Sequence, residues 1–211
     1  MKTYKKTLII TILITILPCF IGLLLWNRLP EQIPTHFNFK NEVDGYSSKP
    51  LAVFGIPLMM VLFQLTCAFA TFNDPKKKYI NSKLIHLILF IIPGCSILIV
   101  ILSYGTALGY PINAGMLCNL LIGVLFLLIG NYMPKVKQNY TMGFKLPWTL
   151  NSEWNWNKTH RLAGWLWILG GLLLLGNAVL RSGLVLLIVI FLVTVIPGIY
   201  SFLLYQKEKA D

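Results

Sequence analysis

Charged residues are scarce in this sequence. Of its 211 residues, 12% are Asp, Glu, Lys or Arg, whereas a typical soluble domain has about 25%. None lies in the six long apolar runs, which span residues 8–26, 51–72, 84–104, 112–133, 162–180 and 183–205. Each run reaches roughly the 20 residues with which an α-helix crosses a bilayer. The scarcity excludes an ordinary soluble domain and predicts an all-α integral membrane protein with six transmembrane helices.

Acidic residues are rarer still, and the predicted spans contain none of the seven. Ion-coupled carriers and intramembrane aspartyl enzymes need such groups near the midplane, so both classes are disfavoured. A channel or uncoupled transporter for a neutral solute, and a purely structural membrane protein, stay open as alternatives.

Cysteine and histidine are too few and too scattered for a metal site. The four cysteines lie singly inside predicted spans, where we expect them to be small, buried apolar residues: Cys19, Cys67, Cys95 and Cys118. His36 and His160 fall in different loops, and His86 lies near one end of the third span. We therefore predict no catalysis, no metal and no cofactor.

Positive charge, in contrast, is abundant and unevenly placed. Fourteen of the 18 Lys and Arg residues lie in the two tails and in the second and fourth loops; the others are Arg28, Lys40, Lys49 and Arg181. The positive-inside rule then puts both termini in the cytoplasm. The net charge of +11 thus reports topology and attraction to anionic membrane lipids, and we predict no direct binding of nucleic acid.

The start of the chain imitates an export signal. A basic tail precedes an apolar run that contains Leu17-Pro18-Cys19, but the run continues to Trp26. That length exceeds an ordinary signal, so we expect a membrane span.

The first outer loop, residues 27–50, is the longest of the three loops expected outside. Pro30 and Pro34 favour an extended exit from the first span, and Asp44-Gly45 is typical of a turn. His36, Glu42 and Asp44 could hold a metal, but their spacing is weak beside a true zinc pattern. We expect a compact, hydrogen-bonded cap.

The inner loop, residues 134–161, is rich in tryptophan and polar residues. Asn151 or Ser152 can cap a helix that carries Glu153 in its first turn. The residues that would share one side of this helix are Trp154, Lys158, Arg161 and Trp165. This pattern predicts a short interfacial amphipathic helix before the fifth span, or alternatively a docking surface for a cytoplasmic partner.

Both loops carry motifs that resemble the SdpI family of bacterial immunity proteins. The outer motif comprises Leu29-Pro30, Ile33-Pro34-x-His36, Asn38, Asp44-Gly45-Tyr46 and Ser48-Lys49-Pro50; the inner one comprises Gly130-Asn131-Tyr132-Met133-Pro134, Asn139, Gly143, Pro147-Trp148-Thr149, Trp156 and Thr159-His160-Arg161. Two positions depart from the family pattern. Asn41 stands about where the family usually has a glycine, a few residues before the aspartate. Lys145 stands where the family usually has an arginine, so the planar group that binds with two parallel hydrogen bonds is lost.

The resemblance implies two modules in a multi-pass protein of the bacterial plasma membrane. Residues 1–72 would form an amino-terminal two-helix module, and residues 73–211 a four-helix module. The implied function is immunity to a secreted antimicrobial peptide or protein toxin, with signal transduction through a cytoplasmic repressor held at the membrane.

The resemblance also implies two sets of site residues. Toxin recognition outside would use His36, Asn38, Asp44, Gly45, Tyr46 and Lys49. Partner docking inside would use Asn131, Asn139, Gly143, Lys145, Pro147, Trp148, Thr149, Trp156, Thr159, His160 and Arg161.

Overall fold

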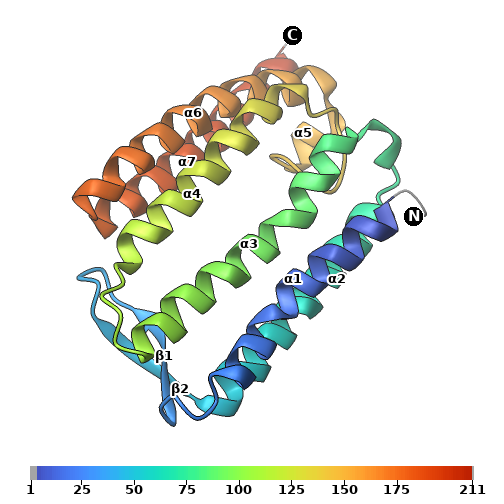
Figure 1. Ribbon diagram of the computed structural model, residues 1–211. Helices are drawn as coiled ribbons and strands as arrows, with labels where there is room; N and C mark the ends of the chain where they lie inside the picture. Colours follow the sequence, from blue (N-terminus) through green and yellow to red (C-terminus); the bar gives the residue numbers. More distant parts are fainter. Residues whose placement is uncertain (1–3, 211) are drawn as a thin grey trace. The chain divides into compact units, whose positions relative to one another are not determined.

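Long helices dominate the computed structural model, which describes residues 4–210 (Figure 1). Six helical segments are long and apolar enough to cross a membrane. They are α1 (Lys5–Leu24), the π-helix η2 (Leu51–Gly55) with α2 (Ile56–Phe72), α3 (Ser82–Ala107), α4 (Ala114–Tyr132) with the 3-10 turn η4 (Met133–Lys135), α6 (Glu153–Leu180) and α7 (Gly183–Ala210). The predicted all-α membrane fold with six spans is therefore confirmed.

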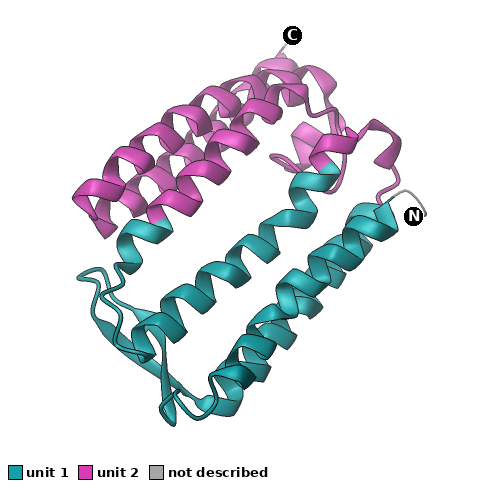
Figure 2. Cartoon of the chain, in the orientation of Figure 1, with its two compact units in different colours: residues 1–72, 85–118 teal, residues 73–84, 119–211 magenta. Residues whose placement is uncertain are grey.

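The chain forms two compact units, coloured separately in Figure 2. Unit 1 contains residues 1–72 and 85–118, and unit 2 contains residues 73–84 and 119–211. The units are interleaved along the sequence, so the division into modules 1–72 and 73–211 stays a prediction.

Unit 1 is held together by polar contacts inside its spans. Gln64 Nε2 donates to Thr11 Oγ1 at 3.0 Å and to the Leu89 carbonyl at 2.8 Å, which links α2 to α1 and α3. Ser96 Oγ donates to the Thr15 carbonyl at 2.8 Å. Because hydrocarbon offers polar groups no water, such contacts secure one helix to another. Gln64 therefore bonds between helices.

Unit 2 is built on close backbone contact between α4 and α6. A Cβ added to Gly130 would lie 2.9 Å from the Gly164 carbonyl oxygen, and one added to Gly171 would lie 2.8 Å from that of Gly123. Only glycine permits the two backbones to approach this closely. Asn177 Nδ2 donates to Asn119 Oδ1 at 2.9 Å, which adds a polar link. The other face of α6 packs against α7.

The outer loop contains a β-hairpin that the sequence did not reveal. Strands β1 (Gln32–Phe37) and β2 (Val43–Ser48) pair antiparallel. The prediction of a turn at Asp44-Gly45 was wrong, since both residues lie within β2. The chain reverses at residues 38–42 instead, because Asn38 Oδ1 accepts hydrogen bonds from the backbone N–H groups of Lys40 and Glu42.

The inner loop carries little regular structure before α6. It contains the five-residue helix α5 (Pro147–Asn151), and the 3-10 turn η3 (Lys77–Tyr79) lies in the preceding inner loop. Ser152 caps α6 as expected, since its Oγ accepts from Asn155 N at 3.0 Å. Residues 153–161 are the first turns of α6 rather than a separate helix. Trp154, Lys158 and Arg161 are all exposed there, but the interfacial position of these turns stays a prediction.

Candidate functional site

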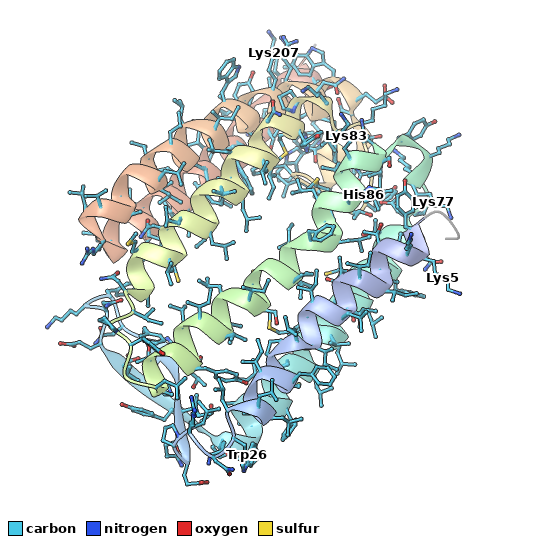
Figure 3. The ribbon with its side chains drawn as sticks, viewed as in Figure 1. Lys5, Trp26, Lys77, Lys83, His86 and Lys207 are labelled. Atoms are coloured by element: carbon cyan, nitrogen blue, oxygen red, sulfur yellow. The ribbon has the colours of Figure 1, made fainter. Side chains whose placement is uncertain are left out.

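In each unit, the lysines labelled in Figure 3 lie at one end. In unit 1, Lys5 and His86 lie at one end and Trp26 lies at the other (Figure 3). In unit 2, Lys83 and Lys207 lie at the end away from the connection between α6 and α7. The positive-inside rule assigns such ends to the cytoplasm, and the cytoplasmic position of both termini stays a prediction on that basis.

The base of the hairpin is fixed by Lys49, which is only 6% exposed. Its Nζ lies 2.8 Å from Glu31 Oε1, donates to the Trp26 carbonyl at 3.3 Å, and sits 5.2 Å from the centre of the Trp26 ring. Ile33 of β1 is fully buried beside Val53 and Tyr104. Lys49 therefore supports the hairpin rather than presenting a free charge.

The tip of the hairpin is fixed by Asn41. This residue has φ +67°, the left-handed conformation that asparagine tolerates in place of glycine. Its Oδ1 accepts a hydrogen bond from Gly115 N in the first turn of α4, at 3.0 Å. Asn38 Nδ2 also donates to Glu42 Oε2 at 2.9 Å across the turn. The hairpin is thus held at both ends.

One face of the hairpin, which we call the hairpin face, is formed by His36, Asp44 and Tyr46. His36 Nδ1 lies 2.5 Å from Asp44 Oδ1, and these side chains are 72% and 43% exposed. Tyr46 is 59% exposed. A Cβ on Gly45 would lie 2.8 Å from His36 Cβ, so glycine at this position makes room for the pair.

Asp74 organises the inner loop, although it belongs to neither loop motif. It is 4% exposed, and its Oδ2 accepts from Tyr140 N at 2.9 Å and from Thr141 Oγ1 at 2.6 Å. Oδ1 accepts from Lys76 N at 2.8 Å. The sequence predictions missed this residue. Its isolation was the available signal, because it is the sole acidic residue between positions 45 and 152.

Asn139 and Thr149 shape the same loop from within. Asn139 Oδ1 accepts from Thr141 N and Met142 N at 2.8 Å each, and its Nδ2 donates to the Lys137 carbonyl. Thr149 Oγ1 accepts from Leu146 N at 2.9 Å and so closes the start of α5. Both side chains are fully buried. They satisfy backbone groups that no helix or sheet would satisfy here.

His160 and Trp156 form the floor of the loop. Their rings stack with centroids 3.9 Å apart, and Trp156 Nε1 donates to the Val136 carbonyl at 2.7 Å. His160 Nε2 accepts from Phe144 N at 3.1 Å, while Nδ1 faces the Trp156 carbonyl at 2.7 Å. A carbonyl only accepts, so Nδ1 carries the proton and the imidazole is neutral. Gly143, with φ +117°, lies so close that a Cβ there would overlap the His160 ring.

A second group of contacts joins the loop to α7. Trp148 Nε1 donates to Ser201 Oγ at 2.9 Å, and its ring stacks on that of Tyr205. Asn155 Nδ2 donates to the Ser201 carbonyl at 2.9 Å, and Thr159 Oγ1 donates to Asn155 Oδ1.

The predicted docking residues therefore divide by exposure. Asn139, Thr149, Trp156, Thr159 and His160 are buried; Gly143 and Trp148 are half-buried; and Asn131, Lys145, Pro147 and Arg161 are exposed. The buried members can reach a partner only through the surface that they support. Their assignment to docking stays a prediction.

Neither loop gathers metal ligands. Within residues 4–210, no group of three or more His, Cys, Asp and Glu side chains is placed to hold a metal ion. The four cysteines are free thiols; Cys19 is buried as expected, whereas Cys67 is exposed.

Six apolar spans joined by structured loops define a multi-pass protein of the bacterial plasma membrane. Residues 135–201 match the SdpI/YfhL protein family, and residues 13–61 match a domain of unknown function, DUF1648. The chain is 29% identical over 209 residues to "Immunity protein SdpI" of Bacillus subtilis (strain 168), across 96% of this chain and 97% of that protein. No solved structure matches. The resemblance to the SdpI family is thereby confirmed over both loop motifs.

Proposed function

We propose that this chain is a membrane immunity protein that protects a bacterium from a secreted antimicrobial peptide or protein toxin. The observation that carries the proposal is its similarity to Immunity protein SdpI, which extends over nearly the full length of both chains. Function on this view is recognition without catalysis, by loops that the six spans hold at the membrane surface.

Toxin recognition falls on the hairpin face. A binding surface gains affinity when its groups are ordered before the partner arrives. The hairpin meets this condition, since Lys49 fixes its base and Asn41 fixes its tip. Between these anchors it presents the Tyr46 ring and the hydrogen-bonded pair His36 and Asp44, and Phe39 at the turn is 69% exposed. Aromatic rings beside polar groups are typical of protein-binding surfaces.

Survival of a sensitive bacterium tests the proposal. Cells expressing the chain would be challenged with membrane-active peptides secreted by related strains. We expect the native chain to protect, and His36→Ala with Tyr46→Ala to lose most of that protection while inserting normally. A suitable control is Arg181→Asn, which changes another exposed residue on the predicted outer side and suits its left-handed backbone.

The possible results separate the site from the function. Equal protection by the hairpin variant and by the control would mean that the hairpin face does not recognise the toxin. Absence of protection by the native chain against every peptide would contradict immunity itself.

A second candidate activity is signalling through a cytoplasmic repressor held at the membrane. It is favoured by the exposure of Arg161, because arginine and aromatic side chains are common anchors of partners. Lys145 is exposed too, and its Nζ donates to the Tyr140 and Thr141 carbonyls. The basic character of this surface would repel the DNA-reading face of a repressor, so another face would bind.

A promoter fusion tests signalling even when the repressor has not been identified. The native chain should raise transcription from its own promoter when toxin is present. Lys145→Ala with Arg161→Ala should abolish that rise and leave toxin protection intact. Induction that persists in this variant would count against the assignment.

A further inference from the structure

A small pocket lies within unit 2 beside the first turns of α6. Its volume is about 290 Å³, and its walls include Lys76, Tyr79, Lys137, Gln138, Glu153 and Trp156. Ligand pockets begin at about 300 Å³, so it suits a small polar group rather than a large molecule. Of the residues assigned above to toxin recognition or partner docking, Trp156 alone lines it.

The cations of the pocket are held in place. Lys76 Nζ donates to Gln138 Oε1 at 2.5 Å and lies 5.7 Å from the centre of the Tyr140 ring. Gln138 is itself fixed, because its Nε2 donates to the Thr149 carbonyl at 2.9 Å. Lys137 Nζ lies 5.9 Å from the centre of the Tyr79 ring. A lysine ammonium has three donors, so both retain donors for a ligand.

The charges that line the pocket favour an anion with a single negative charge. Two lysines face one carboxylate, Glu153, which leaves a single net positive charge. A phosphodiester carries one negative charge and offers acceptor oxygens that match the lysine donors. Of the two aromatic residues that line the pocket, Tyr79 is exposed and can contact the carbon atoms beside such a group, whereas the Trp156 ring is fully buried.

The position of the pocket along the chain agrees with this ligand. Its lining comes from the segment before α3, the segment after α4 and the first turn of α6. These are ends of spans, which lie at the level of lipid headgroups, and the charge rule puts all three inside. We propose that the pocket formed by Lys76, Lys137 and Glu153 binds a phosphate-class anion, and that the headgroup of an inner-leaflet phospholipid supplies it.

Calorimetric titration of the full chain in maltoside detergent tests the site. The probes are short-chain phosphatidylglycerol and, in a parallel arm, inorganic phosphate. Lys137→Gln should weaken lipid binding about tenfold, because it removes a charged hydrogen-bond donor, and a tenfold change corresponds to about 1.4 kcal/mol. Glu153→Gln should tighten it, since it removes the charge that opposes the anion. Lys207→Gln, a control with the same change of charge outside the pocket, should leave binding unchanged.

The expected effects have opposite signs, so simple misfolding of the variants cannot imitate them. Damage to the fold weakens binding in every variant, whereas Glu153→Gln must strengthen it. Equal weakening by Lys137→Gln and Lys207→Gln would overturn the site, as would absence of binding in both arms. Preference for the lipid probe would support a headgroup as the ligand. Equal binding of both probes would overturn that assignment in favour of a free anion.

Discussion

The hairpin face and the inner loop both belong to family motifs, but they use their side chains in opposite ways. In the hairpin, His36, Asp44 and Tyr46 point to the surface, while Lys49 and Asn41 hold the strands from either end. In the inner loop, several motif residues are buried instead, and Asn139, Thr149 and His160 accept hydrogen bonds from backbone N–H groups. A family motif can therefore specify an exposed surface in one loop and the folding of an irregular segment in the other. Unfolding measurements should separate the two cases.

Trp156→Ala should have the largest effect. Its indole is fully buried, stacks on His160 and bonds to the Val136 carbonyl. Replacing a buried tryptophan by alanine costs about 3–5 kcal/mol. Equilibrium unfolding in detergent should show that loss in the free energy of unfolding. The neighbouring Trp154, which is 42% exposed, provides the control. Similar losses for Trp154→Ala and Trp156→Ala would contradict a buried, structural motif.

Gly143→Ala should come next. Alanine at φ +117° is strained, and its Cβ would overlap the His160 ring. Backbone strain and overpacking cost about 1–3 kcal/mol each. Gly109→Ala is a matched control, because Gly109 also has positive φ, +83°, with open space where the Cβ would lie. The difference between the two variants in thermal midpoint measures the overlap with His160. If the midpoints fell equally, strain alone would explain Gly143.

Asp74→Asn should have a smaller effect. Asparagine keeps the size of the side chain but has one acceptor oxygen, so it cannot serve Lys76 N, Tyr140 N and Thr141 Oγ1 together. Hydrogen bonds to charged groups contribute about 1.5–3 kcal/mol, and we expect a loss of that order in the free energy of unfolding. Asp44→Asn on the hairpin face should change it far less. Equal losses would mean that the hairpin pair is also structural.

The spans could be predicted because their signal is local. A helix that crosses lipid needs a long apolar run, so six runs without charge predict six spans. The loops could not be predicted in the same way. The hairpin reverses at Asn38 rather than at Asp44-Gly45, because one amide oxygen binds two backbone N–H groups. The importance of Asp74 depends on partners about 65 positions away in the chain, which no local pattern reveals.

His36→Ala should change stability least. The imidazole is 72% exposed and its ionic partner is also near solvent, so the pair contributes about 0–1 kcal/mol. Its loss should leave the free energy of unfolding almost unchanged, whereas Lys49→Ala should lower it, because Glu31 and the Trp26 carbonyl lose a buried cation. The comparison is completed by measuring, for both variants, the free energy of unfolding and the survival of cells challenged with toxin. A His36→Ala variant that is stable but unprotective would mean that the hairpin face binds; one as unstable as Lys49→Ala would mean that the pair is part of the hairpin's own structure.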